Sequence, residues 1–316
     1  MILCRLCTAN IDGPVDTITY TQCLNADGLM EADITVTKQA ENQFLVIATD
    51  TMHRQFEMLL RRNLDPSGEK NVTVTDITSG YTQLNIQGPK SRDLMQVITD
   101  TDMSNEKFPF RTAREIATGL ARVLVARITY VGELGWELHI PIENLTYVYD
   151  LLWQAGQEFG LINAGYRAIE SLRLEKGYRL WAADIGPDYT PFEAGLGWAV
   201  KLKKDIPFLG RQALLDQTKA PLKRRLACFT VDDKNAFLFG RETIYRKNER
   251  VGWITSGGFG YTVGKMIGYG YVRNEAGVSN EYLEAGTYEL EVATRRVPAK
   301  IHMSALYDPR MERIKA

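Results

Sequence analysis

The sequence has few of the residues that mark several common classes of protein. Its 316 residues include only four cysteines and three histidines, too few for a disulfide-stapled scaffold and too scattered for a histidine metal triad. No apolar run reaches the roughly 20 residues that a membrane-spanning helix needs. The formal net charge is −1, so the basic excess typical of nucleic-acid-binding proteins is missing. We therefore expect no metal site, no membrane span and no nucleic-acid partner.

Two of the cysteines, Cys4 and Cys7, form a CxxC pair. Such a pair can take part in redox chemistry or supply half of a zinc site, but a zinc site needs a second matched pair. Cys23 and Cys228 are far apart in the sequence and do not form one. We therefore expect reduced cysteines in an intracellular protein.

A glycine-rich stretch at residues 258–265, GFGYTVGK, is superficially similar to a phosphate-binding loop. It departs from the Walker A pattern because Phe259 stands where glycine is needed and Met266 replaces Ser or Thr. The stretch also lacks the GxGxxG spacing, and no dinucleotide fingerprint occurs elsewhere in the chain. The sequence thus predicts no site of its own for NAD, FAD or ATP.

What is present is an ordinary globular composition, with 45% hydrophobic and 24% charged residues. The length suggests about two domains. Apolar periodicity predicts helices over 51–62, after Gly88, over 145–159 and over 164–175, and strands over 34–37, 44–48, 72–75, 81–86, 120–129 and 136–140. Beyond about residue 220 the pattern changes to short strands with no convincing helix, typical of a small barrel or sandwich. We expect an α+β chain with a mixed region at 1–205 and a β-barrel domain at 206–316.

Two carboxylates have unusual positions. Asp33 lies at the start of a predicted strand, where aspartate is disfavoured; a turn or cap role is the alternative to a functional one. Glu175 lies near the C-terminal end of a predicted helix, where it opposes the helix dipole by roughly 0.3–1 kcal/mol. Arg173 or Lys176 could neutralise it, and so could a ligand rich in N–H donors. Local sequence leaves both alternatives open.

Several short strings occur in one order along the chain, at 25–28 (NADG), 33–36 (DITV), 87–89 (QGP), 130–137 (YVGELGWE), 171–175 (SLRLE), 190–193 (TPFE) and 251–257 (VGWITSG). Together they resemble the aminomethyltransferase (glycine cleavage T-protein) family over essentially the whole sequence. Residues 175–181, 188–196 and 207–214 are most similar to the folate-binding half of sarcosine and dimethylglycine dehydrogenases. The resemblance implies a T-protein-like folate-binding fold with mixed α/β subdomains and a C-terminal β-barrel.

The resemblance also implies a cofactor, tetrahydrofolate, and residues that hold it. Asp33 matches the catalytic carboxylate, which would lie near N10 of the folate and relay a proton. Glu175 matches the anchor of the pterin ring, and a basic residue near Lys204 would meet the glutamate tail. For Glu133 a turn-stabilising role is the alternative. The implied cofactor-binding positions are Tyr20, Thr35, Tyr130, Glu133, Glu175 and Lys204.

The function implied is that of a one-carbon transfer module of a sarcosine dehydrogenase-like enzyme. It would form 5,10-methylenetetrahydrofolate from an N-methyl group that a flavin domain or subunit has oxidised. FAD would bind to that domain, which precedes this region in the dehydrogenases, so the chain is expected to be part of a longer protein whose fold begins before Met1. A non-catalytic folate-binding or regulatory subunit is one alternative, and the aminomethyltransferase of the glycine cleavage system is another. Ala168-Ile-Glu170 replaces the Ala-Arg-Asp common in T-proteins, which argues against the latter. The expected location is the mitochondrial matrix, or the cytoplasm in a bacterium.

Overall fold

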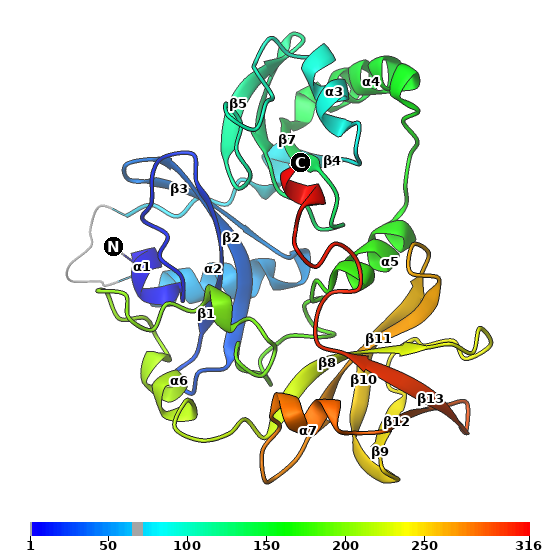
Figure 1. Ribbon diagram of the computed structural model, residues 1–316. Helices are drawn as coiled ribbons and strands as arrows, with labels where there is room; N and C mark the ends of the chain where they lie inside the picture. Colours follow the sequence, from blue (N-terminus) through cyan, green and yellow to red (C-terminus); the bar gives the residue numbers. More distant parts are fainter. Residues whose placement is uncertain (1, 65–71) are drawn as a thin grey trace.

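Three sheets, each formed by a different part of the chain, organise the molecule (Figure 1). The computed structural model describes residues 2–64 and 72–316. The first two sheets are open and carry helices, and the third is a closed barrel. The mixed α/β fold with a C-terminal barrel that the sequence predicts is therefore confirmed.

The first sheet has three antiparallel strands in the order β1-β2-β3. Alternate residues of the central strand, Ala32, Ile34 and Val36, are buried against Phe56 and Leu60 of a helix. Because side chains alternate between the two faces of a strand, the residues between them point to the opposite face. The elements of this part are α1 (Ile2–Leu6), β1 (Ile18–Leu24), β2 (Met30–Ala40), β3 (Gln43–Ala48), η1 (Asp50–Met52) and α2 (His53–Arg62).

The second sheet has four strands in the order β4-β7-β6-β5. Its core is built on Trp136, Leu138 and Ile140 of β7, which pack with Leu94 of α3 and Val148 of α4. The elements here are η2 (Thr78–Gly80), β4 (Tyr81–Gln87), α3 (Ser91–Val97), β5 (Ala113–Thr118), β6 (Ala121–Ala126), β7 (Gly135–Pro141), η3 (Ile142–Asn144), α4 (Leu145–Gly156) and η4 (Gln157–Phe159).

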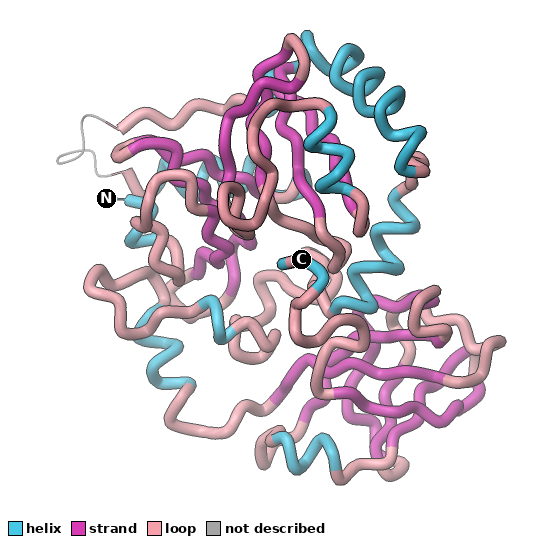
Figure 2. Tube along the Cα trace, turned by 45° about the horizontal axis from the view of Figure 1, so that its top comes forward, coloured by secondary structure: helices cyan, strands magenta, loops and turns pink. Residues whose placement is uncertain are grey.

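Helix α5 (Tyr166–Lys176) leads from the second sheet to the barrel and ends at Gly177, which adopts φ 76°. Glycine is suited to this left-handed position because it has no Cβ. Residues 178–223, with η5 (Gly197–Ala199) and α6 (Arg211–Gln217), return to the first sheet, where Met30 N–H donates to Tyr189 O. Figure 2 shows this long, largely irregular connection.

The barrel closes in the order β10-β11-β8-β13-β12-β9. Its strands are β8 (Arg224–Val231), β9 (Thr243–Arg246), β10 (Glu249–Gly260), β11 (Lys265–Arg273), β12 (Tyr288–Val292) and β13 (Arg295–His302), with α7 (Asn280–Glu284) between β11 and β12 and η6 (Arg313–Lys315) after β13. Phe229, Ile254 and Leu290 are fully buried in its interior. The barrel is thus filled by side chains.

Three element predictions were wrong. Residues 72–75 form no strand, and the strand predicted over 120–129 ends at Ala126. The helix α7 contradicts the expectation of no helix beyond residue 220; the Ser279 side chain caps it by accepting the N–H of Tyr282. Strands β1 and β5 were not anticipated, because their sequences are rich in polar residues.

All four cysteines are free thiols. The main chains of Cys7 and Cys23 form an isolated antiparallel β-bridge, which is not a disulfide. Within the described residues no cluster of three His, Cys, Asp or Glu side chains could bind a metal ion. None of the helices described has the length and apolar character needed to cross a membrane.

Candidate active site

Strand pairing gathers polar side chains on the face of the first sheet that lies opposite its core. Asp33 of β2 pairs with Gln22 of β1, and Thr35 pairs with Tyr20. Because both strands alternate with a period of two, these four side chains share one face. Three of the residues singled out in the sequence, Tyr20, Asp33 and Thr35, are thus brought together.

Asp33 is the chemically distinctive member of this group. Its Oδ1 accepts a hydrogen bond from Gln22 Nε2 at 3.1 Å. Burial raises the pKa of Asp33 to about 6, although hydrogen bonds from Tyr20 and Gln22 and the charge of Arg179 act in the opposite direction. A carboxyl group with a pKa near neutrality can both accept and return a proton at physiological pH.

An aromatic surface lies next to this carboxylate. The ring of Tyr20 stacks on that of Trp198, with centroids 5.4 Å apart and an interplanar angle of 21°. Trp198 is 61% exposed, although a large apolar side chain usually gains from burial. Burial and the neighbouring Asp33 raise the pKa of Tyr20, so its hydroxyl remains protonated. The pair offers a flat apolar surface beside a proton-exchanging group.

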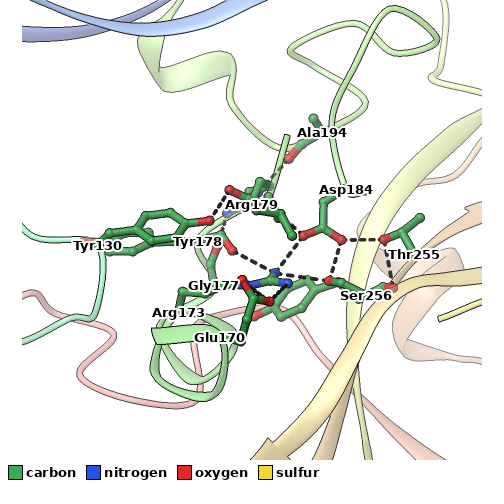
Figure 3. A network of polar contacts seen from close by, with 12 residues as sticks. Tyr130, Glu170, Arg173, Gly177, Tyr178, Arg179, Asp184, Ala194, Thr255 and Ser256 are labelled. Atoms are coloured by element: carbon green, nitrogen blue, oxygen red, sulfur yellow. Dashed lines mark hydrogen bonds and ion pairs between the residues drawn. The ribbon is translucent and has the colours of Figure 1, made fainter. Parts of the chain in front are cut away.

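Tyr130 approaches the same region from the loop before β7. Its hydroxyl donates to the main-chain oxygen of Arg179 at 2.8 Å, and its ring stacks on Tyr178 at 5.8 Å. Arg179 is held by main-chain oxygens, with Nε donating to Ala194 at 3.0 Å and Nη1 to Gly177 at 2.5 Å (Figure 3). This guanidinium is the cation that opposes the rise in the pKa of Asp33.

A buried ion pair lies beneath this segment (Figure 3). Arg173 of α5 and Asp184 are each 1% exposed, and their Nη1 and Oδ2 atoms lie 2.8 Å apart. Asp184 Oδ1 accepts hydrogen bonds from Thr255 and Ser256 of β10, and Oδ2 accepts the N–H of Leu180. The pair therefore joins α5, the barrel and the segment that carries Arg179.

Glu175 is bound by protein donors. Its Oε1 accepts the N–H groups of Thr262 and Val263, in the turn between β10 and β11, at 2.6 and 2.9 Å. The residue is 1% exposed. These backbone groups stabilise one oxygen of the helix-end carboxylate, whereas Oε2 is buried without a hydrogen-bond partner among the described residues, so a role for Glu175 in holding a ligand stays a prediction. Residue spacing could not reveal this, because the donors lie 87 and 88 positions away.

Lys204 also has a structural role. Its ammonium group donates to the main-chain oxygens of Cys4, Cys7 and Ala9 at 2.6, 2.7 and 3.1 Å. An ammonium has three donors, so none remains for a glutamate tail, and the expected contact at Lys204 needs correction. Lys201 and Lys203 line, with Lys204, a hollow of about 640 Å³.

Glu133 holds the C-terminal part of the chain. Its Oε1 accepts a hydrogen bond from the Tyr307 hydroxyl, and Arg313 Nη1 lies 3.8 Å away. Both contacts are to the distant C-terminal segment and neither is within the turn that carries Glu133, so its predicted roles in cofactor binding or turn stabilisation stay predictions.

Sequence reasoning did not single out Glu137, a further carboxylate with a raised pKa, whose side chain is 13% exposed. Burial raises the pKa of Glu137 to about 7, and burial lowers the pKa of His139, whose Nε2 lies 4.0 Å from it, to about 4. Both residues therefore favour their neutral forms inside the protein. The alternation along β7 indicated a solvent-facing side for them, but the fold covers both faces of this strand. Only the presence of two titratable groups in one strand could have drawn attention to them.

We expect Glu137→Gln to change the pH dependence of stability. The pKa of Glu137 is about 7 in the folded protein and about 4.5 in the unfolded chain. The free energy of unfolding should therefore decrease as the pH rises from about 4.5 through about 7. A neutral glutamine avoids this decrease. The free energy of unfolding of the variant minus that of wild type should therefore be up to about 3 kcal/mol larger at pH 8 than at pH 4. Urea unfolding at the two pH values measures this. Glu143→Gln, at an exposed position, is the control, and an identical pH dependence in wild type and Glu137→Gln would contradict the expectation.

Comparison with known proteins agrees with the fold described above. The GCVT N-terminal domain model matches residues 1–204, and the glycine cleavage T-protein C-terminal barrel domain model matches residues 224–308. The crystal structure of aminomethyltransferase T of the glycine cleavage system from Bartonella henselae superimposes with a TM-score of 0.82 over 98% of this chain and 81% of that chain. At 22% identity, this likeness concerns the fold alone.

Two curated relatives have a higher sequence identity to this chain than the Bartonella henselae structure has. Mitochondrial sarcosine dehydrogenase from Mus musculus is 39% identical over 324 residues, which cover 98% of this chain but 35% of the relative. The chain thus spans about a third of the length of that protein. An aminomethyltransferase from Alkaliphilus metalliredigens is 32% identical, covering 90% of this chain and 74% of the relative. The chain therefore belongs to the aminomethyltransferase (glycine cleavage T-protein) family and is homologous to the T-protein-like part of sarcosine dehydrogenase.

Proposed function

We propose that this chain is the tetrahydrofolate-dependent one-carbon transfer module of a sarcosine dehydrogenase-like enzyme. Its product would be 5,10-methylenetetrahydrofolate, formed from an oxidised N-methyl group. Support comes from membership of the aminomethyltransferase family, together with similarity to sarcosine dehydrogenase along 98% of the chain. The observation that carries the proposal is the partly buried carboxylate of Asp33, with a pKa of about 6, beside the Tyr20–Trp198 stack.

The residues present fit a reduced folate. A flat apolar surface of two stacked rings suits a planar heterocycle, and a carboxyl group that titrates near neutrality suits amine nitrogens that gain and lose protons. Tetrahydrofolate, when bound, supplies the two amine nitrogens that take up the one-carbon unit. Asp33 would hold or accept a proton at N10, and its negative charge would stabilise positive charge developing nearby.

The supporting residues position Asp33. Gln22 and Tyr20 donate hydrogen bonds to it and so orient its carboxylate. Arg179 limits the rise of its pKa, which keeps Asp33 ionised at neutral pH and able to accept a proton. Thr35 shares the face and would line the folate, and Tyr130 would contribute from the neighbouring loop.

The wider context belongs to the same proposal. A flavin domain or subunit carrying FAD would oxidise the N-methyl group and deliver the one-carbon unit to this module. Joining the two activities keeps a reactive carbon at high effective concentration and away from water. The location would be the mitochondrial matrix in a eukaryote and the cytoplasm in a bacterium.

Calorimetric titration with tetrahydrofolate tests the proposal. The wild-type chain should bind, and Tyr20→Leu should bind about tenfold more weakly, because it loses ring stacking and one hydrogen bond that orients Asp33. Tyr149→Leu removes a half-exposed tyrosine of α4 and should bind like the wild type. The absence of binding heat for the wild type, or equal affinities of the two variants, would refute the assignment of this site.

A further inference from the structure

The C-terminal segment, residues 303–316, leaves β13 of the barrel and crosses to the second sheet (red in Figure 1). On the way it passes the end of α5, where the N–H groups of Leu306 and Tyr307 donate to Glu175 O. Lys176 and Asp308 form an ion pair of 2.8 Å, with side chains only 3% and 6% exposed. The segment is therefore fastened at its middle.

Two arginines of the second subdomain, which consists of the second sheet with helices α3 and α4, hold the end of this segment. The main-chain oxygen of Ala316 accepts hydrogen bonds from Arg92 Nη2 at 2.6 Å and from Arg127 Nη2 at 2.9 Å. Both guanidiniums lie 5.8 Å from the ring centroid of the buried Trp136. Two cations from different elements, α3 and the end of β6, thus converge on one oxygen over one aromatic ring.

The charges at this point are not balanced. Arg127 is 1% exposed, its Nη1 donates to Phe108 O at 2.7 Å, and its Nε has no hydrogen-bond partner. Burial and the nearby Arg92 lower the pKa of Arg127 to about 10. Among the described residues no Asp or Glu side chain lies within ion-pair distance of either guanidinium. Arg92 binds the neutral oxygens Met103 O and Asn105 Oδ1, and a buried cation without an anion is costly.

We propose that Arg92 and Arg127 form a carboxylate-binding site, and that occupation of this site latches the C-terminal segment onto the second subdomain. A carboxylate fits because its two oxygens can accept from two guanidiniums at once and its charge offsets theirs. In this structure the site holds the main-chain oxygen of Ala316, and a free carboxylate would offer the two guanidiniums oxygen acceptors together with a negative charge.

The latch has a consequence for the loop that carries Tyr130. Tyr307 and Arg313 of the segment contact Glu133, three residues beyond Tyr130. Release of the segment would therefore free the loop between Tyr130 and β7 from its contact with the C-terminal segment. The binding site itself does not depend on the folate proposal, so the two can fail separately.

The first experiment removes the occupant. A chain lacking residues 313–316 should show a melting temperature that rises with sodium acetate relative to sodium chloride at equal ionic strength, because acetate binds the vacated site. The 316-residue chain should show no such acetate-specific rise, and neither should the shortened chain carrying Arg127→Met. An equal response of the shortened and 316-residue chains would overturn the proposal, as would an unchanged acetate effect in the Arg127→Met form.

The second experiment keeps all 316 residues and removes the site. In Arg127→Met, amide hydrogen exchange over residues 303–312 should become about 10- to 100-fold faster, the factor that corresponds to one charged hydrogen bond. Arg122→Met is the control, since Arg122 lies on β6, the strand that directly precedes Arg127, and its side chain is 77% exposed. If Arg127→Met does not fold, Arg92→Met, at a half-buried position on α3, gives the same measurement. Unchanged exchange in the segment would refute the latch.

Discussion

Asp33→Asn should reduce the rate of methylene transfer to tetrahydrofolate by about 10²–10⁴-fold, the range expected when a general acid–base is removed. The amide keeps the shape and one acceptor of the side chain but cannot take up a proton. Binding of tetrahydrofolate should weaken by roughly tenfold at most, the equivalent of one charged hydrogen bond. Turnover is measured in a fusion of this chain with the flavin domain of a sarcosine dehydrogenase, and affinity is measured by calorimetry.

The pH dependence makes this test more specific. Because the pKa of Asp33 is about 6 in the folded protein, the wild-type rate should fall as the pH drops through about 6 and the carboxylate becomes protonated. Asp33→Asn should lose this acid limb. Asp27→Asn, in the exposed turn before β2, is the matched control. Unchanged turnover in Asp33→Asn would remove Asp33 from the mechanism.

Tyr20, Asp33 and Thr35 were predicted from the family resemblance and not from periodicity, because strand β1, which carries Tyr20, was not anticipated. Tyr20, Asp33 and Thr35 lie on neighbouring antiparallel strands, and the period of two puts them on one face once those strands pair. The family resemblance named these positions, and strand register explains why they meet. Periodicity did predict α5, which ends at Gly177 as its left-handed φ requires.

The roles of Glu175 and Lys204 could not be predicted in the same way. Both carry charges that demand partners, but a sequence does not say whether the partner is a ligand or a distant stretch of backbone. Lys204 donates hydrogen bonds to the carbonyl oxygens of Cys4 in α1 and of Cys7 just after it, about 200 positions earlier. Arg127 similarly reaches Ala316, 189 positions away. Long-range contacts of this kind decide whether a charged residue is structural, and they appear only in the folded chain.

Asp184→Asn should destabilise the protein by about 3 kcal/mol or more, because it leaves Arg173 as a buried cation with only Glu170 to offset it. The substitution removes charge while preserving shape, so lost packing does not explain the effect. Denaturant unfolding measures it, and Asp188→Asn, at an exposed position in the same segment, should cost less than about 0.5 kcal/mol.

A double variant, Arg173→Met with Asp184→Leu, measures the net contribution of the ion pair to stability. The single variant measures instead the destabilisation caused by one unpaired buried charge. An apolar pair of similar size removes both desolvation penalties, so the double variant should be more stable than Asp184→Asn, and its free energy of unfolding should approach that of wild type. Folate affinity should still fall in the double variant, since Leu180 and the adjoining Arg179 lose the Asp184 anchor that helps to position them near Asp33. Recovery of stability without recovery of affinity would show that the buried pair serves to position the site. Recovery of both would mean that packing alone sets the position of Arg179.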